Sequence, residues 1–154
     1  AMKTKLELII LLAGMMSCLS ARAQIDIAVN GVQILSKMTK DEVVAKFGEP
    51  DDYQYEDTGD NGINEWYWYG KSHFVFKDDC FIEFTVYDRR FVVTLPGLDA
   101  VVTVGNKFSV LEPLNPEVFD IYGKDYYNIY YLDETISVQI ADRIITFITY
   151  SVSM

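Results

Sequence analysis

Short runs of alternating apolar and polar residues, each bounded by a turn signal, fill most of the chain after residue 62. Three runs follow closely at 66–69, 73–77 and 81–87, separated by Gly70-Lys71-Ser72 and Asp78-Asp79. Alternation with a period of two is typical of β-strands, and connections this short join antiparallel neighbours. The pattern therefore predicts an antiparallel sheet in the first half of the chain.

A second set of strands is predicted at 126–132, 135–140 and 144–150, after a short helix-like stretch from Asn106 to Pro113. At a constant offset of 63, the coinciding residues are Tyr67 and Tyr130, Trp68 and Tyr131, Asp79 and Asp142, Ile82 and Ile145, Phe84 and Phe147, Tyr87 and Tyr150. We interpret this as two copies of one unit. Chance agreement between strands of similar composition is the alternative.

The clearest helix is predicted from Lys40 to Phe47. Thr39 and Glu42 have the spacing of a capping box, and an apolar stripe follows them. Gly48 suits the C-terminal cap, and the proline two residues later prevents continuation. So short a helix must pack on a sheet. The expected fold class is therefore α+β, with two tandem helix-plus-antiparallel-sheet units.

The stretch Glu65-Trp66-Tyr67-Trp68-Tyr69 places four consecutive aromatic residues in one predicted strand. Alternation sends the two tryptophans to one side and the two tyrosines to the other, so only one pair faces the core of its own unit. The other pair is either covered by the second unit or exposed for recognition. Trp and Tyr dominate binding hot spots. The candidate protein-binding residues are Trp66, Tyr67, Trp68, Tyr69, Tyr126, Tyr127, Tyr130, Tyr131, Asp57 and Asp60.

The two aspartates come from residues 51–64, which are polar and strongly acidic and contain an Asp60-Asn61-Gly62 turn signal. This segment is predicted to be a loop or loose hairpin at the edge of the aromatic surface. Taken as an EF-hand from Asp57, it fails, because Trp68 stands where the twelfth position needs a carboxylate. An irregular cation site and a solvated turn are the two remaining interpretations, and we expect no metal site and no cofactor.

The segment 38–50, followed by Trp66-Tyr67-Trp68-Tyr69 and the turn after Phe74-Val75-Phe76, resembles the β-lactamase-inhibitor-protein-like family. The small outer-membrane-assembly lipoproteins carry a similar single unit. The resemblance covers residues 32–87 well and 101–150 loosely. It implies a tandem of two units, 24–95 and 96–154, whose sheets form a concave aromatic face that binds another protein.

The first 23 residues have the features of a secretory signal peptide. Lys3 and Lys5 precede a short apolar run, and Ala21-Arg22-Ala23 gives the cleavage pattern that places the mature start at Gln24. The run is too short to span a membrane. Lipid attachment at Cys18 is the less favoured alternative. The protein is thus expected to be periplasmic or secreted.

The chain is acidic, with a formal net charge of −10. Removal of residues 1–23 takes away three basic and one acidic side chain, which leaves −12. Nucleic acid would be repelled by such a charge, whereas a basic protein would be attracted and its encounter accelerated.

Catalytic chemistry finds little support. His73 is the only histidine, and Cys80 lacks a Cys-x-x-Cys partner. The chain has no phosphate-binding glycine loop, no Gly-x-Ser-x-Gly elbow and no His-Glu-x-x-His motif. A dyad of His73 and Cys80 is the remaining enzymatic interpretation, and we do not favour it.

These observations predict an exported, non-catalytic protein-binding module. One form is an inhibitor or immunity-type protein that acts on a basic secreted or periplasmic enzyme. The alternatives are an envelope assembly or scaffold protein and a carrier of a small molecule or cation.

Overall fold

The computed structural model describes residues 26–153. The expected signal peptide, its cleavage site and the alternative lipid site at Cys18 lie outside the described residues.

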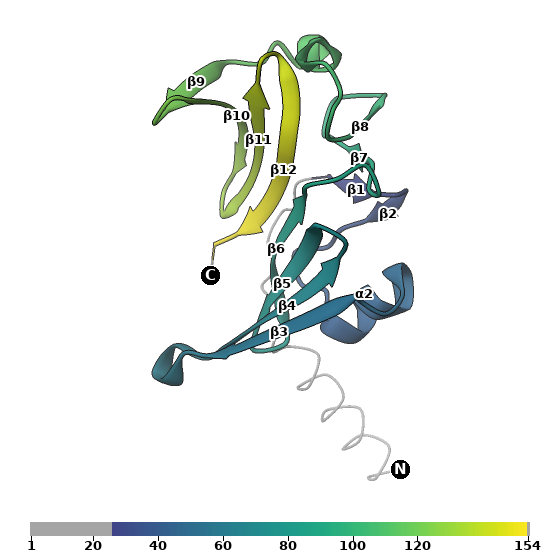
Figure 1. Cartoon of the computed structure of the whole chain (residues 1–154), viewed down its shortest axis with the longest axis vertical. Coiled ribbons are helices and arrows are strands. Elements are labelled where there is room, and N and C mark those ends of the chain that lie inside the picture. The colour runs from purple at the N-terminus through teal and green to yellow at the C-terminus, as the bar shows by residue number, and fades with distance from the viewer. Residues whose placement is uncertain (1–25, 154) are drawn as a thin grey trace, which may run out of the picture.

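A single eight-stranded antiparallel sheet forms most of the molecule (Figure 1). Its strands, in spatial order, are β3 (Asp52–Asp57), β4 (Ile63–Tyr69), β5 (Ser72–Lys77), β6 (Cys80–Val86), β12 (Ile144–Val152), β11 (Glu134–Ala141), β10 (Lys124–Tyr131) and β9 (Val118–Ile121). Strands β3 to β6 and strands β9 to β12 therefore form two meanders, and the pairing of β6 with β12 joins them into one sheet.

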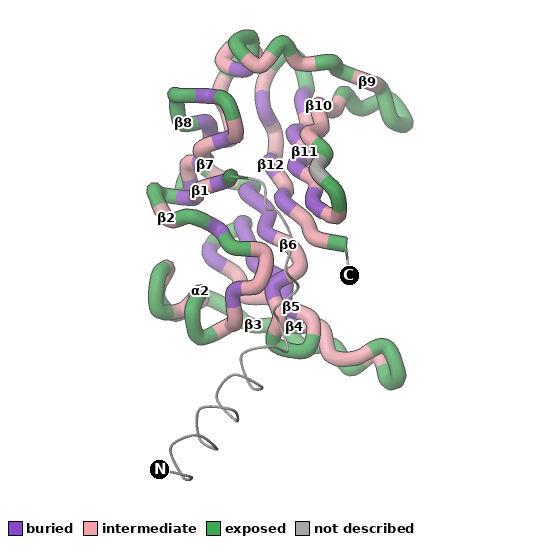
Figure 2. The backbone as a smooth tube through the Cα atoms, turned by 180° about the vertical axis from the view of Figure 1, so that it is seen from behind, coloured by how far each residue is buried: buried purple, intermediate pink, exposed green. Residues whose placement is uncertain are grey.

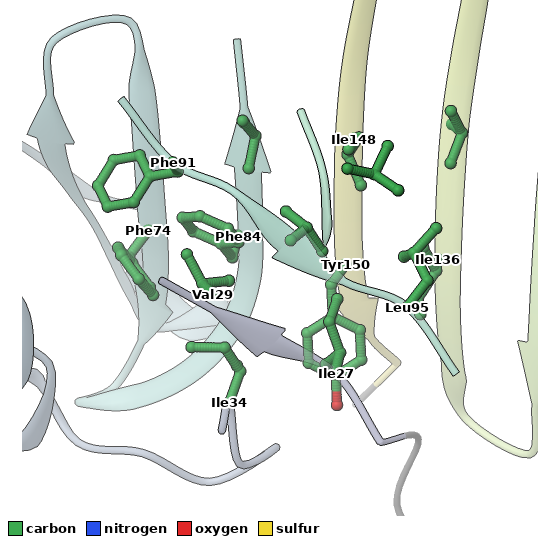
Figure 3. Close-up of a cluster of buried hydrophobic side chains, with 14 of the residues drawn as sticks. Ile27, Val29, Ile34, Phe74, Phe84, Phe91, Leu95, Ile136, Ile148 and Tyr150 are labelled. Carbon is green, nitrogen blue, oxygen red and sulfur yellow. The ribbon is translucent and has the colours of Figure 1, made fainter. Parts of the chain in front are cut away.

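A small four-stranded sheet packs on one face of the large one. It contains β2 (Val32–Gln33), β1 (Ala28–Val29), β7 (Val93–Thr94) and β8 (Val101–Val102), in that spatial order. Figure 3 shows Val29 and Leu95 from this layer facing Phe84, Tyr150 and Ile148 of the large sheet. All five are buried, and they belong to one hydrophobic cluster. We call this side of the large sheet the core face.

The predicted helix is confirmed as α2 (Lys40–Phe47), with the capping box of Thr39 and Glu42 formed in both directions. It packs its Phe47 ring against Phe74 at 5.1 Å and against Phe91 at 6.1 Å between centroids. The second predicted helix is instead a 3₁₀ segment, η3 (Phe108–Leu114), which contains Pro113. A proline here removes a donor and cannot sit inside an α-helix without cost.

The prediction of two tandem helix-plus-sheet units is wrong. Of the described residues, only 40–47 form an α-helix, and the strands make two antiparallel sheets of four and eight strands, so the fold is mostly β. The sequence pattern predicted β4, β5, β6, β10, β11 and β12 but did not define β3 or β9. The β6–β12 pairing and the small sheet depend on contacts between distant segments. One hydrophobic cluster contains residues from both 24–95 and 96–154. The division into those two domains stays a prediction.

The hairpins β5–β6 and β11–β12 have the same construction. Their turns are Asp78-Asp79 and Asp142-Arg143, an offset of 64 (142 − 78), and all four residues have positive φ. Paired positive φ values are typical of the two-residue turn that matches strand twist. Both hairpins also have a register shift at the same place, after Val75 and after Gln139.

The predicted offset of 63 is therefore one residue short. A shift of one residue moves every side chain to the opposite face of a sheet. The offset of 63 matched Tyr87, which is 43% exposed, to Tyr150, which is fully buried. At an offset of 64, Phe84 falls on Ile148 and Val86 on Tyr150, and all four are buried.

The seam between the two meanders has a polar centre. Thr85 of β6 pairs in register with Thr149 of β12, and their hydroxyl oxygens are hydrogen-bonded at 3.1 Å. These residues are themselves 64 apart (149 − 85), so equivalent positions of the two hairpins meet at the seam. The large sheet thus has an approximate two-fold relation about this pair.

The acidic segment 51–64 is a hairpin, the second of its two predicted forms, and not a loop. It forms β3, the short 3₁₀ turn η2 (Gly59–Asn61) and the start of β4. Every residue of β3 is exposed, as Figure 2 shows for this end of the sheet. Charged side chains on an edge strand discourage pairing with other chains, which accounts for the acidic composition of a strand.

Candidate functional site

The face of the large sheet opposite the core face is covered by neither the small sheet nor α2, and we call it the open face. Figures 1 and 2 show the β3–β4 and β9–β10 hairpins extending away from the small sheet, one at each end of this face. The strand register decides which side chains it presents.

The two tryptophans of β4 lie on the open face. Tyr69 is fully buried, and its hydroxyl donates to the carbonyl of Gly48 at 2.8 Å. Tyr67 packs partly buried against the core. Trp66 and Trp68 are only partly covered and alternate with these tyrosines, so they lie on the open face. The sequence predicted this separation of pairs and left open which pair was inside.

In β10 the same alternation divides the tyrosines. Tyr127 packs against the core, whereas Tyr126 and Tyr130 are on the open face, and Tyr130 is 68% exposed. Tyr131 ends β10 opposite Glu134, and its side chain is outside the description. Of the ten candidate residues, Trp66, Trp68, Tyr126 and Tyr130 therefore share one surface, while Tyr67, Tyr69 and Tyr127 do not.

Rings on the open face form a line that crosses the sheet from β4 to β9. We call this line the aromatic track. Its members, in spatial order, are Trp68, His73, Tyr87, Phe147, Tyr126 and Phe119. Consecutive ring centroids are 4.4, 6.0, 5.4, 6.2 and 6.5 Å apart. Aromatic pairs at these separations stabilise each other, so the track is a pre-arranged surface.

Sequence reasoning named only two of the six track residues, Trp68 and Tyr126, as binding candidates. His73, Tyr87, Phe147 and Phe119 were not among the candidates, and the offset of 63 matched Tyr87 and Phe147 to residues that lie in the core. The alternation in β6 and β12 could have placed both rings on the polar face of their strands, since Tyr87 and Phe147 have the parity of Thr85 and Thr149. Only the strand pairing shows that these rings adjoin His73 and Tyr126.

Hydrogen-bonded polar side chains run beside the track. The Thr85 hydroxyl donates to Glu83 Oε1 at 3.1 Å. In the other meander, Ser137 donates to Asn128 Oδ1 at 2.7 Å, and Asn128 Nδ2 donates to the Tyr130 hydroxyl at 2.6 Å. These bonds hold the side chains in fixed positions, which lowers the entropy lost when a partner binds.

His73 is a structural member of the track. The residue is 9% exposed and lies between the rings of Trp68 and Tyr87. Its Nε2 is 3.6 Å from Glu83 Oε1, and this contact with His73 holds the pKa of the Glu83 carboxyl below its usual value. Its Nδ1 is buried and has no hydrogen-bond partner in residues 26–153. Neither ring nitrogen is directed at an open position where a substrate proton would sit.

The proposed dyad of His73 and Cys80 is not assembled. The register places His73 opposite Thr85, whereas Cys80 is opposite Lys77 at the other end of the same hairpin. Among the residues that the structure describes, no group of three or more His, Cys, Asp or Glu side chains is arranged to hold a metal ion.

The acidic candidates Asp57 and Asp60 lie at the tip of the β3–β4 hairpin, away from the track. Asp57 Oδ1 accepts from the amide of Gly59 at 2.9 Å, which stabilises the turn. Glu83 is the acidic group beside His73. At the β3 edge, Asp52 pairs with Trp68, and Glu56 lies further along the same side of β3, opposite Asn64. The acidic rim of the open face is therefore formed by β3 itself.

A cavity lies beside η3. It is lined by Lys107, Phe108, Ser109, Glu112, Asp142, Arg143 and Ile144. It is broadly open, contains a single aromatic ring and lies at the β11–β12 turn, so it is not the closed aromatic cavity expected of a carrier.

No family model matches this chain, and no curated protein matches it. The crystal structure of a DUF4309 family protein, YjgB, from Bacillus subtilis is similar with a TM-score of 0.42 and 18% sequence identity, over 75% of this chain and 78% of that one. The resemblance to the β-lactamase-inhibitor-protein-like family is thus without support from a matching family model.

None of the helices in the described part of the chain has the length and apolar character needed to cross a membrane.

Proposed function

We propose that this chain is an exported, non-catalytic protein-binding module that recognises its partner through the open face. The aromatic track is the observation that carries the proposal. It presents Trp, Tyr and Phe side chains on a sheet whose other face is already packed, so the chain's own core does not need them. Such residues are enriched in binding hot spots.

The burial pattern supports recognition over a purely structural role. Tyr87 and Tyr130 are 43% and 68% exposed, although each lies beside other open-face side chains. The exposed parts of these rings contribute nothing to folding stability. Tyr87 belongs to the aromatic track and Tyr130 lies on the same face, so a partner on the open face can cover both.

Charge favours a basic partner. Asp52 and Glu56 on β3 border the Trp66 and Trp68 end of the open face, and the chain carries a net charge of −10. Opposite charges at the rim of an interface accelerate encounter and fix orientation more than they add affinity. An inhibitor or immunity-type protein that blocks a basic exported enzyme fits this arrangement, and an envelope assembly protein is the alternative. The protein-binding role implied by the resemblance to the β-lactamase-inhibitor-protein-like proteins is part of this proposal.

The experiment is a capture of partners from the envelope and secreted fractions of the source organism, with the wild-type chain and three variants. Trp68→Ala and Tyr130→Ala each remove a ring from the open face. Tyr55→Ala is the matched control, because Tyr55 is 51% exposed but has the opposite parity in β3.

Loss of a hot-spot ring should weaken the affinity for the captured partner by about 30-fold, which corresponds to about 2 kcal/mol. Tyr55→Ala should leave the affinity unchanged. If both open-face variants retained wild-type affinity for every captured protein, the open face would not be the recognition surface.

A further inference from the structure

We propose that the partner segment bound by the open face is an extended, proline-rich peptide that lies along the aromatic track, across the strands. This inference rests on the proposed function and adds the chemistry of the bound segment. It follows from the direction of the track, the hydrogen-bond donors beside it and the charges at its two ends.

The direction of the track requires an extended ligand. The line from Trp68 to Phe119 begins on β4, next to one edge strand, and ends on β9, the other edge strand. The strands between them are hydrogen-bonded to neighbours on both sides, so no partner strand can insert there. A ligand on this face must therefore be recognised through side chains, one ring after another.

The ring chemistry suits proline. Polyproline II segments have no internal hydrogen bonds and little conformational entropy to lose, and aromatic-lined surfaces are their usual binding sites. A proline-rich segment offers backbone carbonyl acceptors but few N–H donors. The complementary surface must combine flat apolar rings with free donors.

The tryptophans supply those donors. Neither the Trp66 nor the Trp68 indole N–H donates a hydrogen bond to any residue in the described part of the chain, and both residues are partly covered. Neither nitrogen is a buried atom without a partner, so both N–H groups are open to a ligand. Buried or half-buried indole groups usually have an acceptor. The amide of Gln139 is in contrast already used, since it donates to the Tyr126 hydroxyl at 2.9 Å. The two indole N–H groups at the β4 end of the track are thus available to the carbonyl acceptors of a ligand.

The charges at the two ends of the track predict the direction in which the ligand lies. Glu83 is the one carboxylate beside the middle of the track, and it is held by His73 and Thr85. Asp52 borders the β4 end, whereas Lys124 shares the open-face parity of Tyr126 at the β9 end. A neutral proline-rich stretch with a basic residue at its β4 end and an acidic residue at its β9 end is complementary to this pattern.

The probe is a synthetic peptide of eight prolines between two lysines and two glutamates, titrated into the full-length protein by calorimetry. A peptide with the same lysine and glutamate ends and a glycine-serine centre is the control, because it measures the binding that charge alone provides. Cellohexaose is the third ligand, because a neutral linear sugar could also stack on aromatic rings. Circular dichroism confirms that each variant is folded.

Saturable binding of the proline peptide is expected, at least tenfold tighter than binding of the glycine-serine peptide. Trp68→Ala and Tyr87→Ala should each weaken it by at least tenfold, and Trp68→Phe should weaken it less than Trp68→Ala because the ring remains. Tyr55→Ala should leave it unchanged.

Three results would overturn the inference: no preference for proline over glycine-serine, equal binding to wild type and Trp68→Ala, or tighter binding of cellohexaose than of the peptide. The two proposals fail separately. Capture of a protein that depends on Trp68, without proline-peptide binding, would refute the inference and leave the proposed function standing. Cellohexaose binding without any protein capture that depends on Trp68 would refute both.

Discussion

Truncation of Phe84 should destabilise the protein far more than truncation of Tyr87. Tyr87 follows Phe84 by three residues in the chain, but its side chain lies on the opposite face of the large sheet. Phe84 is 1% exposed, and its ring lies 4.4 Å from Phe74 and 5.7 Å from Phe91 between centroids. Tyr87 is 43% exposed and contacts rings of the open face only. The comparison tests which face of the sheet is the core.

For Phe84→Ala we expect a loss of about 3–5 kcal/mol in the free energy of unfolding, since a buried ring is removed and a cavity remains. For Tyr87→Ala we expect about 1 kcal/mol, because two partly solvated ring contacts are lost and no cavity forms. The difference should be at least about 2 kcal/mol.

Equilibrium unfolding in urea, followed by far-UV circular dichroism, measures both values, and the slope of the transition should stay constant. Phe84→Leu, with a smaller expected loss, serves if Phe84→Ala does not fold. Equal losses for the variants at 84 and 87, or a larger loss at 87, would show that the assignment of faces is inverted.

Further predictions concern the buried polar groups. Glu134→Ala should lower the free energy of unfolding by about 1–3 kcal/mol in urea titrations, because the buried Tyr150 hydroxyl donates to Glu134 Oε1 at 2.7 Å and would lose this acceptor; an unchanged midpoint would contradict this. Burial raises the pKa of Tyr69 to about 12, and burial also raises the pKa of Tyr150. Because these folded-state values exceed the usual value of about 10, the stability they contribute is complete below pH 10 and is lost as the pH rises toward 12. Absorbance titration at alkaline pH should show late ionisation of these phenols, and Tyr69→Phe should flatten the decline in stability; a decline equal to that of wild type would argue against it. Thr149→Val should cost about 1 kcal/mol by removing the Thr85 hydrogen-bond partner at the seam, and an increase in stability would show that the bond is not formed in solution.

The candidate site was only partly predictable because a strand's alternation defines two faces but does not label them. Residues 66–69 were correctly divided into a tryptophan pair and a tyrosine pair. Which pair is inside depended on what covers the sheet, and the covering layer comes from residues 28–33 and 93–102, two-residue strands with no strong pattern of their own. The open face is then assembled across the β6–β12 pairing, where the neighbouring rings Tyr87 and Phe147 are 60 residues apart in the sequence (147 − 87). Sequence spacing holds no information on such neighbours.

The sequence by itself determined the local structure of this protein. The helix from Lys40 to Phe47 follows from its capping box and its glycine stop, and the hairpins follow from alternation and turn residues, because these depend on groups within a few residues of one another. Only the tertiary structure decided that β6 pairs with β12 and that Thr85 meets Thr149. That pairing is non-local, and a one-residue error in aligning the hairpins exchanges core for surface. The aromatic track exists because this long-range pairing brings two meanders into one sheet.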